Sequence, residues 1–180
     1  HLHLPLQSGS ARVLRAMQRG YTPRRFLDRL AMMRSAVPGL AVTTDVIVGF
    51  PGETEGDFGA TLEVMEEAGF DGAYMFVYSP RPGTPAAAME GQVDPAVAAE
   101  RFSRLADLQQ RLSLARNEEI VGREVEVLTE GPSRKDPGMA TTRTRTNKVV
   151  HLPGDFPPGT FLQARIERAA PSHLIGRLVP

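Results

Sequence analysis

Three small polar residues follow the first apolar stretch of the chain and could bind a ligand. Gln7, Ser8 and Ser10 end the segment HLHLPLQSGS, directly before a pattern typical of a helix. Amide and hydroxyl groups beside a helix N-terminus can hydrogen-bond a phosphate, a carboxylate or a ribose. Serines in this position also cap helices, so a purely structural role is the alternative.

A carboxylate lies within an apolar strand that runs into a tight turn. Asp45 belongs to the run from Leu40 to Val48, and a buried carboxylate requires a partner. Gly49 then begins a Gly-Phe-Pro-Gly turn. Binding and catalytic groups of α/β folds gather at the carboxyl ends of such strands. Asp45 and Gly49 are therefore predicted to lie near a ligand, although an ordinary strand-to-helix connection has the same pattern.

One arginine follows the next apolar strand. Arg81 lies between two prolines, which hold its backbone in an extended conformation, and it comes three residues after Tyr78. An arginine fixed at a strand end suits contact with an anion. A surface turn is the alternative.

The segment from Thr141 to Lys148 is the clearest candidate for nucleic-acid binding. Arg143 and Arg145 alternate along a predicted strand and would project from one face, while Asn147 and Lys148 add further hydrogen-bond donors. Each contact with a phosphate would make binding depend on salt concentration. A solvated, charged strand is the alternative.

Neighbouring residues indicate how nucleic acid would be contacted. Arg134 and Lys135 enlarge the positive patch. Phe156 and Phe161 are the only Phe, Tyr or Trp residues of this region. We therefore expect contact with the phosphate backbone more than stacking on bases.

The composition excludes several kinds of chemistry. The chain has no Cys, so it has no disulfide, no thiolate nucleophile and no Cys-ligated metal. His1 and His3 face one side of a strand, but they lack a third ligand at a recognisable spacing, and no metal site is expected. No apolar run approaches the ~20 residues of a membrane span.

The first half of the chain alternates between strands and helices. Strands are predicted at 2–6, 40–48 and 73–78, and helices at 11–18, 22–37 and 54–68. Thr54 and Asp57 fit a capping box at the start of the third helix. This alternation predicts parallel strands with right-handed crossovers. Three strands are few for a closed barrel, so we expect the sheet to lack neighbours that belong to a longer chain.

The pattern changes after a long helix from Asp94-Pro95 to about Val121. Residues 124–128 and 162–166 alternate with period 2, residues 140–152 form a long polar-then-apolar strand region, and residues 173–179 supply a last strand, with Gly and Pro turns between them. Four or five short strands in about 60 residues predict a small all-β barrel. The predicted fold class is α/β plus all-β, with domains at residues 1–121 and 122–180.

The net charge of zero conceals an asymmetry between these two parts. Residues 1–119 hold 12 Lys and Arg against 15 Asp and Glu, whereas residues 120–180 hold nine against six. The second part is therefore the better candidate for an anionic partner.

Five ordered segments resemble the radical S-adenosylmethionine methylthiotransferases. They are HLPLQSGS, VLRAMQRGYT, TTDVIVGFPGET, YSPRPGTPAA and RTRTNKVVH. The similarity covers essentially the whole chain and is greatest to the members that modify tRNA. It implies that residues 1–121 are the C-terminal part of a radical SAM (β/α) barrel. Residues 122–180 would be an OB-like TRAM domain that binds RNA.

The resemblance also implies a reaction and its cofactors. Family members add a methylthio group to carbon 2 of isopentenyladenosine next to the anticodon, using S-adenosylmethionine and two 4Fe-4S clusters. The six cysteines that hold these clusters are missing from this chain. The chain alone is therefore expected to be inactive, with no catalytic residue and no metal ligand of its own.

Site residues follow from matching positions. The residues expected near S-adenosylmethionine are Gln7, Ser8, Ser10, Asp45 and Gly49. Arg81 would lie on the substrate side, and the residues expected to contact RNA are Arg134, Lys135, Arg143, Arg145, Asn147 and Lys148. The expected partners are the tRNA anticodon stem-loop and a sulfur donor system. The full-length protein is expected to be cytoplasmic, monomeric and without a membrane partner.

Three alternatives to this methylthiotransferase remain open. A sister enzyme methylthiolates an aspartate of a ribosomal protein and shares the barrel motifs, but usually has a more acidic segment where this chain has residues 143–148. A threonylcarbamoyl-adenosine methylthiotransferase also acts on tRNA. A non-catalytic RNA-binding module would lack a CxxxCxxC motif upstream of His1.

Overall fold

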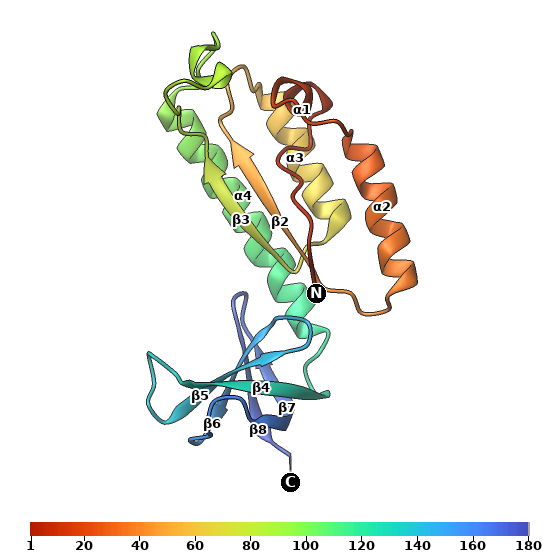
Figure 1. Ribbon diagram of the computed structural model, residues 1–180, viewed down its shortest axis with the longest axis vertical. Helices are drawn as coiled ribbons and strands as arrows, with labels where there is room; N and C mark the ends of the chain where they lie inside the picture. Colours follow the sequence, from red (N-terminus) through yellow and green to blue (C-terminus); the bar gives the residue numbers. More distant parts are fainter. Residues whose placement is uncertain (180) are drawn as a thin grey trace. The chain divides into compact units, whose positions relative to one another are not determined.

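The computed structural model describes residues 1–179 and divides into two compact units. The first unit, Leu2–Gln109, is a parallel sheet with helices, and the second, from Gln110 onward, is a closed barrel (Figure 1). The predicted class, α/β followed by all-β, is confirmed.

Three parallel strands form the first sheet. They are β1 (Leu2–His3), β2 (Val42–Val48) and β3 (Gly72–Val77), in the order β1-β2-β3. The first strand is shorter than the predicted 2–6, because Pro5 has no N–H to donate to the ladder. Pairing resumes only as a single bridge between Gln7 and Val46.

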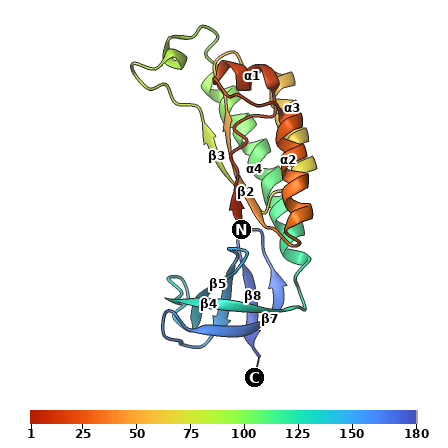
Figure 2. The ribbon, with the colours of Figure 1, turned by 45° about the vertical axis from the view of Figure 1, so that its right-hand side comes forward.

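The helices cover one face of this sheet. Figure 2 shows α2 (Pro23–Ala36), α3 (Glu55–Ala68) and α4 (Pro95–Glu118) on the same side of the strands, with α1 (Ala11–Ala16) at their carboxyl ends. Burial along β2 alternates accordingly: its four helix-facing residues are buried and the three between them are half-buried. The opposite face of the sheet carries no helix of this unit.

Local signals in the sequence set the ends of α3. The Thr54 side chain accepts from the Asp57 amide and the Asp57 side chain accepts from the Thr54 amide, which confirms the capping box. Gly69 ends the helix in the left-handed conformation, with φ 54°. The preceding turn uses Gly49 and Gly52 at φ 74° and 78°, which a residue with a Cβ rarely adopts.

Five strands close into the barrel. They are β4 (Glu124–Pro132), β5 (Met139–Thr144), β6 (Val149–Pro153), β7 (Phe161–Ala169) and β8 (Leu174–Leu178). Their order is β4-β5-β6-β8-β7, and β6 and β8 run parallel. Inward residues of β4, β6, β7 and β8 form its core: Val127, Val150, Leu152, Ala164, Ile166 and Leu174.

The prediction of one strand region over 140–152 is wrong, because the chain reverses within it. Strand β5 ends at Thr144 and β6 begins at Val149. Asn147 takes the turn at φ 65°, a conformation that Asn tolerates, and its amide donates to Thr144 O at 2.9 Å. Arg145 consequently lies in a turn and does not alternate with Arg143 along a strand.

The end of α4 packs with the barrel. Asn117 Nδ2 donates to Ala170 O at 2.7 Å, and Ile120 packs against the barrel core. The Gly122 amide then donates to Ile166 O at 2.8 Å. Among the described helices, α4 included, none has an apolar stretch that could cross a membrane.

Candidate functional site

A cavity of about 640 Å³ lies where β2 and β3 end. Its walls include Gln7, Asp45, Phe50, Tyr78 and Arg81. A space of this size, with apolar walls and a few polar groups, is typical of a site for a nucleoside-sized ligand.

The backbone of Gln7 is strained at the edge of this cavity. Gln7 is buried with φ 66°, a conformation that costs a non-glycine residue about 1–3 kcal/mol. Its amide donates to Asp45 O at 2.7 Å and its carbonyl accepts from the Ile47 amide at 2.9 Å. The Gln7 carboxamide meets Arg19 Nη2 at 3.4 Å. The strand pairing thus holds this side chain at the cavity wall.

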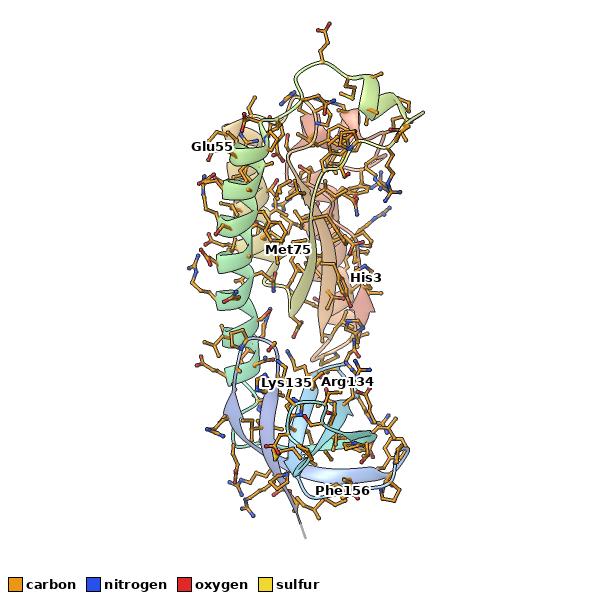
Figure 3. All side chains as sticks on the ribbon, turned by 90° about the vertical axis from the view of Figure 1, so that its left-hand side faces the viewer. His3, Glu55, Met75, Arg134, Lys135 and Phe156 are labelled. Carbon is orange, nitrogen blue, oxygen red and sulfur yellow. The ribbon has the colours of Figure 1, made fainter. Side chains whose placement is uncertain are left out.

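Asp45 has its partner on the helix-free face of the sheet. His3 Nε2 lies 3.3 Å from Asp45 Oδ1, and His3 Nδ1 lies 2.9 Å from Thr43 Oγ1. The His3 ring also packs edge-on against Tyr74, with centroids 5.7 Å apart. The view in Figure 3 places His3 on the sheet of the first unit. Sequence reasoning had rejected His3 as a metal ligand without finding its carboxylate partner.

Two predicted cofactor residues are turned away from the cavity. Ser8 Oγ accepts from the Ser10 amide at 3.1 Å and lies 3.4 Å from Thr61 Oγ1. Ser10 caps α1 by accepting from the Val13 amide, and its hydroxyl donates to Asp57 Oδ1 at 2.6 Å. Both serines are more than nine-tenths buried. Their hydroxyls position the start of α1 and do not line the cavity.

The turn after β2 is fixed by a buried ion pair. The Gly49 amide donates to Glu53 Oε2 at 2.8 Å, and Arg101 Nη1 from α4 lies 2.9 Å from the same oxygen. Burial raises the pKa of Glu53, and the bonds from Gly49 and Arg101 oppose this rise. Gly49 therefore positions the turn rather than lining the cavity.

Tyr78 and Phe50 form an aromatic part of the cavity wall. Tyr78 OH is buried and has no hydrogen-bond partner among the described residues. The Tyr78 ring packs edge-on against Phe50, with centroids 5.3 Å apart. Arg81 lies on the rim with an exposed side chain. A ligand in this cavity would meet an aromatic pair and a cation.

The arginines of the predicted nucleic-acid strand are paired within the barrel. Arg143 binds Glu130 through two bonds, Nε to Oε1 at 2.6 Å and Nη2 to Oε2 at 3.1 Å, which lower the pKa of Glu130. Arg145 Nε lies 2.8 Å from Glu126 Oε1. The structure brings these two arginines to β4, where carboxylates compensate their charge.

The other two residues of that segment also have partners within this unit. Asn147 Oδ1 accepts from Arg143 Nη1 at 3.2 Å, and Lys148 Nζ donates to Asn117 Oδ1 at 2.9 Å. These contacts fix the turn between β5 and β6 against the end of α4.

Arg134 and Lys135 lie at a second cavity, of about 680 Å³. Figure 3 shows them beside each other on the barrel and far from Phe156. The walls also contain His151 of β6 and His173, which precedes β8. Sequence reasoning missed both histidines, since only the pairing of β6 with β8 brings them together. Within the described residues, no group of three or more His, Cys, Asp and Glu could hold a metal ion.

Comparison with known proteins identifies both units. Residues 1–65 match the radical SAM superfamily, and residues 118–179 match the TRAM domain. A tRNA-2-methylthio-N(6)-dimethylallyladenosine synthase of Moorella thermoacetica is 51% identical over 99% of this chain and 40% of that protein. A protein of the same name from Mycolicibacterium smegmatis is 53% identical over 97% of the chain and 35% of its own length. The chain thus spans well under half of these relatives.

Proposed function

We propose that this chain, a member of the radical S-adenosylmethionine superfamily that also carries a TRAM domain, is part of a tRNA methylthiotransferase. The reaction would place a methylthio group on carbon 2 of isopentenyladenosine next to the anticodon. The identity of 51% across nearly the whole chain to a protein named for this product carries the proposal.

The first cavity fits part of S-adenosylmethionine, which when bound supplies the radical for this chemistry. Its size and its Phe50–Tyr78 wall suit an adenosine. The Gln7 carboxamide and the Asp45 carboxylate, both in the cavity wall, are polar groups that could orient it. Arg81 on the rim is placed to contact an RNA phosphate.

The chain has no cysteine that could hold an iron–sulfur cluster. Cys thiolates hold such clusters, and the chain contains no Cys, so we propose no cluster ligand within it. We also propose, from the family alone, that two 4Fe-4S clusters and a sulfur donor system serve the reaction in a monomeric, cytoplasmic full-length protein.

The barrel is proposed to bind the anticodon stem-loop of tRNA. Its match to the TRAM domain and the names of the relatives support RNA rather than a ribosomal protein as the substrate. Of the residues predicted for this contact, Arg143 and Arg145 are paired with carboxylates, whereas Arg134 and Lys135 have no ion pair among the described residues. The RNA contact would therefore centre on them more than on Arg143 and Arg145.

A chimera tests the proposed reaction. This chain would replace the matching segment of the Moorella relative. The chimera would be given tRNA from a strain that does not add the methylthio group, and the product would be analysed by mass spectrometry. We expect 2-methylthio-isopentenyladenosine to be formed. Asp45→Ala should reduce product strongly, whereas Asp28→Ala, on the exposed side of α2, should leave it unchanged.

Two results with the chimera would contradict parts of this proposal. A chimera that folds and shows the absorbance of its iron–sulfur clusters, but gives no product on tRNA, would contradict the proposed function. If the Asp45→Ala variant were as active as the Asp28→Ala control, Asp45 would not contribute to the site.

A further inference from the structure

The second cavity is formed by the barrel alone. It opens between the loop that follows β4 and the residues that precede β8. The loop is braced internally: Ser133 Oγ accepts from the Lys135 amide at 3.4 Å, and Asp136 Oδ1 accepts from the Gly138 amide at 3.0 Å. Arg134 and Lys135 are thus presented by an ordered loop.

The charge of this cavity is positive. Neither Arg134 nor Lys135 has an ion pair among the residues that the structure describes. Of the two carboxylates in the walls, Glu130 is paired with Arg143, and Asp136 accepts from the Gly138 amide and keeps its charge. Two cations thus face one unpaired carboxylate, and an anion entering the cavity would meet a surplus of one positive charge.

The opposite wall is formed by two imidazole rings. His151 and His173 pack edge to face, with centroids 5.2 Å apart. Burial, His151 and Lys135 lower the pKa of His173 below its ordinary 6.5, so its ring is neutral at pH 7. His151 Nδ1 is buried without a partner, which leaves Nε2 as the nitrogen that can face a ligand. Met139, Val149 and Ile175 complete an apolar surface beside the rings.

We propose that this cavity binds one unpaired nucleotide of RNA, with its phosphate on Arg134 and Lys135 and its base against His151 and His173. Unpaired bases bind to proteins by stacking on flat side chains, whereas the bases of a duplex are not exposed in this way. This inference rests on the proposed function and adds to it the site and the form of RNA that the barrel would recognise.

Fluorescence anisotropy with the full 180-residue chain tests the site. The probes are a labelled anticodon stem-loop, which has an unpaired loop, and a blunt RNA duplex of the same length. Arg134→Ala/Lys135→Ala should weaken binding to the stem-loop at least about tenfold, and each lost phosphate contact should reduce the salt slope by about 0.7. Arg177→Ala is the matched control, because the Arg177 guanidinium is paired with Glu167. This variant should weaken binding of the stem-loop less than twofold.

The base contact needs its own variant and readout. His173→Ala should weaken binding of the stem-loop by roughly 10-fold to 100-fold, leave its salt slope unchanged, and hardly affect the duplex. Imidazole NMR signals of the wild-type chain provide a readout that does not depend on the variant folding. The signals of His151 and His173 should shift when the stem-loop or adenosine monophosphate is added, and less when inorganic phosphate is added.

Two results would overturn the inference. Stem-loop binding that is equal in the wild type and in both cavity variants would place the RNA elsewhere on the chain, while the proposed function stood. Equal affinity of the wild type for stem-loop and duplex, with unmoved histidine signals, would exclude an unpaired nucleotide here. The chimera described above tests the reaction independently of either result.

Discussion

Asp57 ties together the starts of two helices of the first unit, α1 and α3. Ser10 Oγ donates to Oδ1 at 2.6 Å, the Thr54 amide donates to Oδ2 at 2.9 Å, and Arg12 forms an ion pair with the same carboxylate. Partial burial disfavours the charge of Asp57, but these hydrogen bonds outweigh it and hold the pKa well below its usual range.

Asp57→Asn should destabilise the first unit by about 1–3 kcal/mol at pH 7, because several donors lose a charged acceptor. The wild-type contribution is complete above the unfolded-state pKa of 3.8 and is lost as the pH falls below it. The difference between wild type and variant should therefore shrink in acid. Urea unfolding at several pH values would measure it.

The matched control for Asp57 is Asp28 of α2. Asp28 pairs with Arg24 on the surface, and both side chains are more than half exposed. Such pairs contribute little, so Asp28→Asn should change stability by less than about 0.5 kcal/mol. A similar loss of stability in both variants would contradict the stabilising role given to Asp57. So would a stability difference between wild type and Asp57→Asn that stays constant down to acid pH.

At the scale of elements, α3 is placed by a close approach of the chain at Gly9. A Cβ on Gly9 would lie 2.4 Å from Ala60 O and 2.5 Å from Thr61 Cα. The Gly9 amide donates to Thr61 Oγ1 at 3.0 Å and holds this contact. Any side chain here would push the turn that contains Gln7 away from the helix.

Gly9→Ala should therefore destabilise the first unit by about 2 kcal/mol or more, as overpacking does. Gly59, in α3 itself, is the control, because nothing lies within 4 Å of its added Cβ. Gly59→Ala should stabilise the unit by up to about 1 kcal/mol through helix propensity. Thermal unfolding followed by circular dichroism should show unfolding temperatures that shift in opposite directions for the two variants. A loss of stability in both variants would contradict the role given to the close approach at Gly9.

The elements were predictable where the signal is local. Thr54 with Asp57 marks the start of α3 and Gly69 marks its end, since caps depend on residues within one turn. The reversal at Asn147 was missed, because no Gly or Pro accompanies it and β5 and β6 then appear as one run. That error placed Arg145 on a strand with Arg143.

At the scale of the molecule, the site depends on pairings that no local pattern encodes. Arg101 meets Glu53 across 48 residues of sequence, and His3 meets Asp45 through the pairing of β1 with β2. Both cavities also need strands that are distant in the sequence to lie side by side. The sequence could therefore name Gln7, Asp45, Arg81, Arg134 and Lys135 as site residues, but it could not find the Phe50–Tyr78 contact or the His151–His173 pair.

The end of α4 stabilises the barrel, which predicts where the second unit can be cut. Asn117 bonds Ala170 O and Lys148, and Ile120 packs on the barrel core. A chain of residues 110–180 should therefore unfold cooperatively in urea and be about 1–3 kcal/mol more stable than one of residues 122–180. Asn117→Ala in the longer chain should remove much of this difference, whereas exposed Glu118→Ala should not. Equal stability of the two chains would mean that the barrel's own closed core is sufficient and that the helix end only adjoins it.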